Sequence, residues 1–313
     1  MAMTSSSSRR RMESDDLAPV REAYAEEIRR TVSLRSTALV RAFATVPRER
    51  FLAPGPWVIT RLGPGGLVRE TTQDADPRHL YQDVLVVIDP QRLLNNGQPS
   101  SLAAWLDALD PRTGDHVLHV GCGPGYYTAI LAEVVGPTGH VTALEIDPEL
   151  ASGARANLAD FDQVEVIEGN GVQPLARRFD GIIVNAGACL AHPTWLEALR
   201  PGGRLILPLT VDDESWRRQF PAAPGIGWGY ILQVKRAQAG YTASFISPVF
   251  IFHCLGARDA ALDARLREGF EADTWRNVRS VRRDAHPPQE SCWLHTEASC
   301  ISMQEPGGSG DRE

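Results

Sequence analysis

Between residues 115 and 209, short apolar runs alternate with segments in which apolar residues recur every three or four positions. The short runs are typical of buried strands, and the spaced segments are typical of helices that pack through one face. This alternation predicts an α/β fold with a doubly wound, mostly parallel sheet and helices on both faces. The predicted strands are 117–120, 141–145, 164–168, 181–185 and 204–207, and the predicted helices are 126–135, 148–158 and 193–199.

The N-terminal part of the chain lacks this alternation. Helical spacing extends over residues 17–44 and stops before Pro47, because proline cannot continue a helix. Residues 55–76 are rich in glycine and proline and predict a loop, whereas the apolar run 84–88 predicts a short strand. Residues 100–109 predict a further helix whose first residue, a serine, is its N-cap. We therefore expect N-terminal helices before the sheet.

The pattern changes again after residue 209. Two apolar runs, 229–236 and 241–252, flank a turn and predict an antiparallel addition to the sheet. Residues 257–281 are charged and predict a helix, and residues 286–303 predict a short hairpin that covers an apolar patch. We expect a main domain over 17–255, which includes the N-terminal helices, and an extension over 256–303, between disordered tails at 1–16 and 304–313.

A glycine-rich turn joins the first predicted strand of the sheet to its helix. Gly121, Gly123 and Gly125 lie in the segment VGCGPGYY, and residues without Cβ let a ligand approach the backbone closely. The third small residue of a dinucleotide site is here Tyr126, which disfavours a nicotinamide cofactor. Glu145 ends the next predicted strand, where a carboxylate can accept hydrogen bonds from both ribose hydroxyls. The pattern therefore predicts an adenosine-cofactor site.

Composition and charge exclude several classes of protein. Of the 313 residues, 43% are hydrophobic, which is ample for a core, and the net charge is -7 at pH 7. An acidic chain disfavours nucleic-acid binding, which needs basic residues opposite the phosphates. No apolar run reaches the roughly 18 residues of a membrane span. We expect a cytoplasmic protein without a membrane or nucleic-acid partner, and the sequence leaves its oligomeric state open.

The cysteines do not indicate a metal centre. None of the five belongs to a C-x-x-C pair, and the segment 286–295, with two histidines and one cysteine, matches no common zinc spacing. The spacing therefore predicts no metal site. Cys292 and Cys300 fall within the predicted C-terminal hairpin, but scattered cysteines are more typical of a reducing cytoplasm than of disulfides.

Several motifs occur in an order that resembles one known family, and their order is more specific than any single motif. The resemblance is to protein-L-isoaspartate O-methyltransferases, over roughly residues 34–255. It implies a Rossmann-like class I methyltransferase fold, S-adenosylmethionine as the cofactor, and methyl transfer to a carboxylate on a protein or peptide. The segments are VRAFATVPRERFLAP, LYQDVLVVIDPQRLLNNGQPSSLAAWLDAL, VLHVGCGPGYYTAILAEVVG, VIEGNGVQPL, RFDGIIVNAGA and LRPGGRLILPL.

The resemblance assigns cofactor contacts around the carboxyl ends of the predicted strands, and two of the positions depart from the family. His119 stands where an acid commonly helps to hold the amino group of the cofactor, and a neutral imidazole can still accept a hydrogen bond there. Asn170 stands where another acid is common, and its amide can contact the adenine amino group. The assigned positions are His119, Gly121, Cys122, Gly123, Gly125, Tyr126, Glu145, Ile146, Asn170, Gly171 and Asn185.

A third departure lies in the loop that the family uses for its substrate. The Ser-Gln-Pro turn of the family is here Gly97-Gln98-Pro99, so the hydroxyl expected to bind the substrate carboxylate is missing. Polar side chains close by could replace it, as could the backbone amide of Gly97. The candidate substrate loop comprises Asn95, Asn96, Gly97, Gln98, Ser100 and Ser101.

The sequence identifies no catalytic residue with certainty. A carboxylate nucleophile with a pKa near ~4 is ionised at neutral pH and needs no general base, so the lack of a clear base agrees with carboxyl methylation. Two alternatives remain open. One is a methyltransferase that acts on a modified peptide or a small natural product, and the other is a non-catalytic pseudo-methyltransferase that binds a partner.

Overall fold

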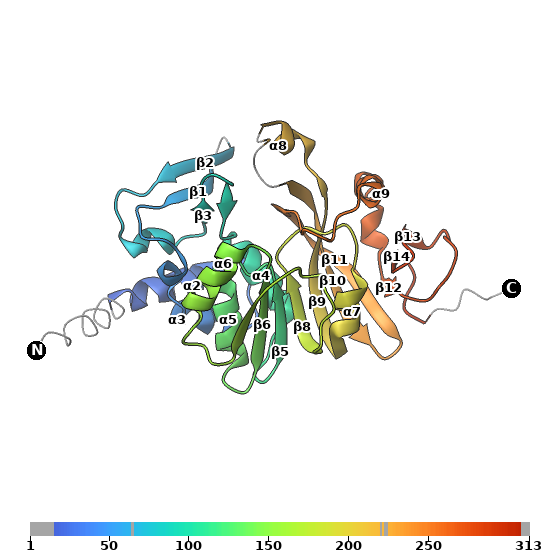
Figure 1. Cartoon of the computed structure of the whole chain (residues 1–313), viewed down its shortest axis with the longest axis horizontal. Helices are drawn as coiled ribbons and strands as arrows, with labels where there is room; N and C mark the ends of the chain where they lie inside the picture. Colours follow the sequence, from blue (N-terminus) through green and yellow to red (C-terminus); the bar gives the residue numbers. More distant parts are fainter. Residues whose placement is uncertain (1–15, 64–65, 220, 222–224, 308–313) are drawn as a thin grey trace, which may run out of the picture.

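A ten-stranded mixed sheet forms the centre of the computed structural model, which describes residues 16–63, 66–219, 221 and 225–307 (Figure 1). Its parallel part has the order β9-β8-β5-β6-β7. After β7 the chain returns to place β8 on the other side of β5, so the strand order switches at β5. The predicted α/β fold with a doubly wound, parallel core is confirmed. The strands of this part are β5 (His116–Val120), β6 (His140–Glu145), β7 (Val164–Glu168), β8 (Phe179–Val184) and β9 (Leu199–Asp212).

Each face of the sheet buries its own apolar cluster. Neighbouring residues of a strand point to opposite faces, so Val117 joins one cluster and Leu118 the other. Helix α5 (Tyr126–Val135) is apolar on both sides, because the sheet covers one side and the N-terminal helix α3 the other. The other helices next to the sheet are α4 (Pro99–Leu109), α6 (Pro148–Asn157), α7 (Pro193–Ala198) and α9 (Ala260–Glu271).

The N-terminal segment predicted as a single helix over 17–44 forms two helices. The first, α2 (Ala18–Val32), ends at Ser33, whose φ of 53° is left-handed. The second, α3 (Thr37–Thr45), begins after Ser36, whose side chain accepts a hydrogen bond from the Leu39 amide at 3.3 Å. A short 3-10 helix, η1 (Arg48–Phe51), follows Pro47.

A second sheet with the order β2-β1-β3-β4 lies next to the N-terminal helices (Figure 1). The prediction of a loop over residues 55–76 is wrong, because the first two strands pair antiparallel from Val58 opposite Thr71 to Gly63 opposite Gly66. The strand predicted at 84–88 is confirmed. The elements of this part are β1 (Val58–Gly63), β2 (Gly66–Thr71), η2 (Pro77–Leu80), β3 (Leu85–Asp89) and β4 (Leu94–Asn95).

Antiparallel strands extend the central sheet beyond β9, as predicted, up to an edge formed by the C-terminal hairpin. The helix predicted over 257–281 is confirmed only for α9, because a 3-10 helix and a strand follow it. The hairpin predicted within 286–303 is confirmed. The elements of this part are α8 (Glu214–Gln219), β10 (Ile226–Ala237), β11 (Gly240–Phe252), η3 (Thr274–Asn277), β12 (Ser280–Arg282), β13 (Cys292–His295) and β14 (Cys300–Ser302).

The predicted tails fall mostly beyond the part that the structure describes. Residues 1–15 and 308–313 lie outside the described residues. Within the described ranges, no helix combines the length and the apolar composition that crossing a bilayer requires. All five cysteines are free thiols.

Candidate cofactor and acceptor site

A cavity of about 530 Å³ opens at the carboxyl ends of β5, β6, β7 and β8. Its walls come from the turn after β5, the ends of the neighbouring strands, the β3–β4 loop and the segment that follows β11. Open α/β sheets bind their ligands in this position, next to the strand at which the order switches. The two sets of residues predicted from the sequence, for the cofactor and for the substrate, both contribute to these walls.

Hydrogen bonds of its own backbone hold the glycine turn after β5 in place. The amides of Gly121 and Cys122 donate to the Leu144 carbonyl at 2.8 and 3.1 Å. The Gly123 amide donates to Glu145 Oε2 at 2.8 Å. A Cβ on Gly123 would have no described atom within 4 Å. This part of the turn therefore borders open space, which a ligand can fill up to the backbone.

Gly125 has a different role from the two glycines before it. It is the N-cap residue of α5 and has a φ of 98°. A Cβ at this position would come within 2.8 Å of Leu158 Cδ1, at the end of α6. Glycine thus allows α5 to begin close to α6, and Gly125 itself does not line the cavity.

The carboxylate of Glu145 is fixed at the end of β6. The residue is 7% exposed, and its Oε1 accepts a hydrogen bond from the Asp147 amide at 3.1 Å, while Oε2 is bound by the glycine turn. A carboxylate offers about four acceptor positions, so two remain for the hydroxyls of a ribose. This geometry is the one that the predicted ribose contact needs.

Most of the predicted cofactor residues line the cavity. Those that do are Gly121, Cys122, Gly123, Tyr126, Glu145, Ile146, Gly171 and Asn185. The residues of this set lie far apart in the sequence and come together only because the carboxyl ends of parallel strands meet at one edge of the sheet.

His119 and Asn170 do not line the cavity, although the resemblance assigns both to the cofactor. The His119 ring is fully buried, and its Nδ1 lies 2.9 Å from Thr128 Oγ1 on α5. Burial lowers the pKa of His119 to about 4, so the ring is neutral at pH 7. Asn170 accepts a hydrogen bond from the Val172 amide at 3.1 Å and lies against Gly256, after β11.

The candidate substrate loop contains residues that face the cavity and residues that anchor the loop. Asn95 and Asn96 line the cavity. The amide and Oγ of Ser100 donate instead to the two oxygens of Asp83, at 2.8 and 2.7 Å. Gln98 Nε2 donates to the same carboxylate at 2.9 Å. Gln98 and Ser100 therefore fasten the loop to the segment before β3.

The backbone of Gly97 is also engaged within the loop. Its amide donates to Asn95 Oδ1 at 2.9 Å, and its carbonyl accepts a hydrogen bond from the Tyr127 hydroxyl at 3.2 Å. The amide offered by the sequence as a replacement for the missing serine therefore already has a partner. Ser101 lies in the first turn of α4 and does not line the cavity. The predicted serine N-cap of α4 is wrong, because Gln98 is the N-cap residue and the helix begins at Pro99.

Asn96 combines a structural contact with an unpaired donor. The residue is 7% exposed, and its Oδ1 accepts hydrogen bonds from the Val86 amide at 3.0 Å and from Arg48 Nη2 at 3.4 Å. Its Nδ2 is buried and has no hydrogen-bond partner among the described residues. Buried donors are nearly always satisfied, so the unpaired amide of this cavity-lining residue is a candidate donor to a ligand.

Arg48 holds this wall together, although its role was not predicted from the sequence. It is fully buried in η1, and its guanidinium donates to the carbonyls of Leu80, Gln82 and Val84 at 2.6, 3.1 and 2.7 Å. It thereby joins the N-terminal helices to the chain that leads into β3. The available signal was its place in the Val-Pro-Arg motif, since an arginine is rarely buried without such a set of partners.

The polar residues that line the cavity without having been predicted include Arg92 and His253. Arg92, in the β3–β4 loop, pairs with Asp89 and Asp147. His253 directly follows β11, and its Nε2 lies 3.5 Å from Asp212 Oδ1. Burial lowers the pKa of His253. Neither residue carries a sequence signal, because each reaches the cavity from a segment remote from the glycine turn.

The chain resembles curated proteins of one family. Residues 69–220 match the family model for protein-L-isoaspartate(D-aspartate) O-methyltransferase. The protein-L-isoaspartate O-methyltransferase of Methanopyrus kandleri is 34% identical over 194 residues, which cover 60% of this chain and 76% of the relative. That of Pelotomaculum thermopropionicum is 35% identical over 189 residues, which cover 58% of this chain and 74% of the relative.

Solved structures agree on the fold. A protein-L-isoaspartate O-methyltransferase superposes with a TM-score of 0.58 at 21% identity, covering 80% of this chain and 69% of that chain. A Plasmodium falciparum protein described as a protein-L-isoaspartate O-methyltransferase, solved with S-adenosyl-L-homocysteine, superposes with a TM-score of 0.54 at 18% identity, covering 76% and 99%. At such identities the likeness shows the fold alone.

Proposed function

Since the chain belongs to the protein-L-isoaspartate O-methyltransferase family of S-adenosylmethionine-dependent methyltransferases, we propose that it methylates a carboxylate of a protein or peptide. One observation carries the proposal: a single cavity is lined on one side by the glycine turn and on another by the β3–β4 loop, and the two walls carry different polar groups. The wall at the glycine turn presents the fixed carboxylate of Glu145. The wall at the β3–β4 loop contains Asn96, whose buried Nδ2 has no hydrogen-bond partner among the described residues.

The wall at the glycine turn fits the cofactor. The open space at Gly123 lets a ligand reach the backbone, and Glu145 keeps two acceptor positions for a ribose diol. Ile146, which is 42% exposed next to it, offers an apolar surface to an adenine ring. When bound, S-adenosylmethionine supplies the activated methyl carbon. The chain's own residues hold and orient it.

The wall at the β3–β4 loop fits a carboxylate. An amide donor such as Asn96 Nδ2 can bind one carboxylate oxygen and leave the other free to attack. A carboxylate with a pKa near ~4 is ionised at neutral pH, so this chemistry needs no general base. The chain must instead position the carboxylate in line with the methyl group, because fixing two reacting groups in line removes much of the entropic barrier.

The direct test compares two peptides with the same sequence, one with an isoaspartyl residue and the other with an aspartyl residue. We expect transfer of labelled methyl from S-adenosylmethionine to the isoaspartyl peptide only, together with calorimetric binding of S-adenosylhomocysteine. Normal binding of S-adenosylhomocysteine without turnover of either peptide would reject the isoaspartyl acceptor and favour a modified peptide or a small natural product. Absence of S-adenosylhomocysteine binding would favour a non-catalytic module.

Asn96→Asp tests the acceptor wall with little change of shape. The aspartate keeps an oxygen for the Val86 amide and for Arg48, but it replaces the Nδ2 donor with an anionic oxygen that repels a carboxylate. A hydrogen bond to a charged group contributes about 1.5–3 kcal/mol, so kcat/KM should fall at least roughly tenfold, and the affinity for S-adenosylhomocysteine should stay unchanged. Asn277→Asp, on the exposed surface of η3, is the control for the added charge. Equal kcat/KM in both variants would contradict the assignment.

A further inference from the structure

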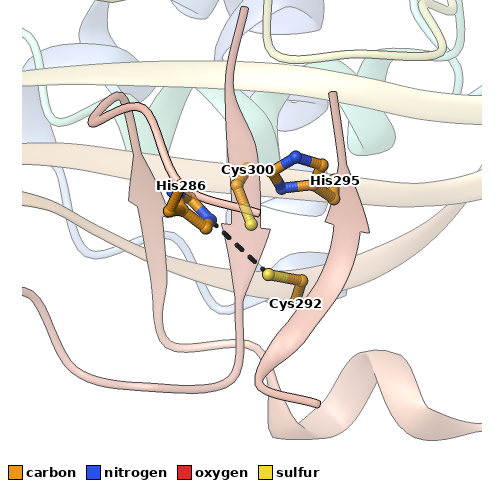
Figure 2. A group of neighbouring side chains, drawn as sticks. All are labelled: His286, Cys292, His295 and Cys300. Atoms are coloured by element: carbon orange, nitrogen blue, oxygen red, sulfur yellow. Dashed lines mark hydrogen bonds between the residues drawn. The ribbon is translucent and has the colours of Figure 1, made fainter. Parts of the chain in front are cut away.

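Four metal-ligating side chains converge in the C-terminal extension, beyond the residues 69–220 that the family model matches. Cys292 and His295 come from β13, Cys300 comes from β14, and His286 comes from the loop before β13 (Figure 2). Their ligand atoms all lie within 4.8 Å of one another. A tetrahedral zinc ion, with Zn–S bonds of about 2.3 Å and Zn–N bonds of about 2.0 Å, separates its ligand atoms by roughly 3.3–3.8 Å. Small side-chain movements would therefore close the set around one ion.

We propose that this His2Cys2 cluster binds one zinc ion, which joins the loop before β13 to the C-terminal hairpin. Two thiolates and two neutral imidazoles form a common ligand set of closed, structural zinc sites. The two thiolate charges balance the charge of Zn²⁺, so the occupied site is neutral. Soft sulfur ligands combined with imidazole select zinc over the oxygen-seeking cations Mg²⁺ and Ca²⁺.

A β-bulge brings the two ligands of β13 to the same face. Cys292 and His295 are three residues apart, and in a regular strand such residues point to opposite faces. In this hairpin, Cys292 pairs with Ser302 and His295 pairs with Cys300, and the register shifts between Cys292 and Leu294. The extra residue of the bulge restores the alternation, so both β13 ligands lie on the face of Cys300. The spacing of these residues in the sequence did not predict the cluster, because zinc-site spacings do not take account of a β-bulge.

The surroundings of both histidines agree with metal binding. His286 Nδ1 donates to the Asp284 carbonyl at 2.8 Å, which leaves the lone pair on Nε2. That Nε2 lies 3.5 Å from Cys292 Sγ, a separation that suits two ligands of one zinc ion. A metal-bound histidine usually donates its other ring N–H to a carbonyl or carboxylate in this way. His295 Nδ1 is buried and has no hydrogen-bond partner in the described part of the chain.

The position of the cluster indicates what the ion does. Each strand that carries or borders it has three or four residues, and residues 283–289 form no helix or strand. Trp293, at the bulge, packs against Phe245 and Phe270. The zinc ion would therefore hold the bulged strand in the register that presses Trp293 onto the sheet and α9. Small elements of this kind commonly depend on a metal or a disulfide.

The metal content of the full chain tests the proposal. The chain is expressed without a histidine tag, given excess zinc and desalted, and its zinc is measured by plasma mass spectrometry. We expect about one zinc per chain, and a loss of at least roughly tenfold in Cys300→Ser and in His286→Gln. Cys189→Ser and His79→Gln, which replace the same residue types outside the cluster, should keep the metal. Wild-type chain without zinc, or cluster variants that retain it, would overturn the proposal.

A second measurement uses the unaltered chain, so it does not depend on whether a variant folds. Replacement of zinc by Co²⁺ should give the visible absorption of a tetrahedral site together with thiolate-to-metal charge transfer. Octahedral or sulfur-free spectra would refute the ligand set. A thiol titration after anaerobic unfolding with a chelator should find all five cysteines reactive. Three reactive thiols would show a Cys292–Cys300 disulfide in place of the metal site.

Discussion

Replacing Gly97 with serine creates the Ser-Gln-Pro turn that the family resemblance led us to expect, but we predict that the added hydroxyl does not improve methyl transfer. Gly97 has a φ of 79°, in the left-handed region, which costs an ordinary residue about 1–2 kcal/mol. A Cβ at this position would also lie 3.0 Å from Leu102 Cδ2, so the Leu102 side chain must move. We expect Gly97→Ser and Gly97→Ala each to lower the free energy of unfolding by about 1–3 kcal/mol.

Equilibrium unfolding in urea measures this loss, and a second glycine separates its two causes. Gly202 has a φ of 82°, is exposed, and would place its Cβ where no described atom lies within 4 Å. Gly202→Ala therefore reports the backbone cost alone. The additional loss in Gly97→Ala reports the contact with Leu102. Comparison of Gly97→Ser with Gly97→Ala then isolates the hydroxyl, because both variants carry the same Cβ.

Methyl transfer to the isoaspartyl peptide provides the second readout for these variants. The Gly97 carbonyl and amide bind Tyr127 and Asn95, so a change of the turn backbone displaces the wall that faces the acceptor. We expect kcat/KM to fall by a similar factor in both variants, with the affinity for S-adenosylhomocysteine preserved. Wild-type stability of Gly97→Ser, or a kcat/KM above wild type in Gly97→Ser but not in Gly97→Ala, would contradict both expectations.

Three further predictions concern the buried polar groups of the site. Glu145→Gln removes the charge of the ribose acceptor and should weaken S-adenosylhomocysteine binding, measured by calorimetry, by about tenfold to a hundredfold, whereas Glu133→Gln on the exposed face of α5 should not. Arg48→Lys cannot reach all the carbonyls that the guanidinium binds, and it should lower the free energy of unfolding by about 2–4 kcal/mol and raise the peptide KM without weakening S-adenosylhomocysteine binding. The pKa of His119 falls from 6.5 to about 4 on folding, so the unfolded chain binds more protons between these values and stability declines as the pH falls. From pH 7 to pH 5 the wild type should lose about 2 kcal/mol more than His119→Asn in urea unfolding, and equal losses would contradict the burial argument.

The parallel core could be predicted from the sequence because its signals are local. A strand buried on both faces is a continuous apolar run, and α5 is covered on both sides, so its pattern is equally plain. The hairpin of β1 and β2 was missed because its glycines and prolines indicate a loop, whereas in the fold β1 pairs with both β2 and β3. The break at Ser33 was missed because apolar spacing continues through it, and a left-handed residue leaves no trace in that spacing.

The site also contains residues with a local sequence signal and residues without one. The glycine turn and Glu145 belong to one strand–helix–strand unit, so their spacing in the sequence reports their spacing in the fold. Arg92 and His253 reach the cavity from segments more than a hundred residues apart, and no spacing rule connects them. The His2Cys2 cluster requires both a hairpin register and a bulge.

The two walls of the cavity are therefore built by different means. The wall at the glycine turn is fixed by hydrogen bonds from its own backbone amides, to the Leu144 carbonyl and to the Glu145 carboxylate, so its geometry depends on few side chains. The wall at the acceptor loop depends instead on side chains: Arg48 holds Asn96, and Asp83 holds Ser100. A substitution at Gly97 can alter that wall while these anchors keep the fold. Binding of the cofactor can thus be inherited with the fold, whereas the identity of the methyl acceptor must be measured on this chain.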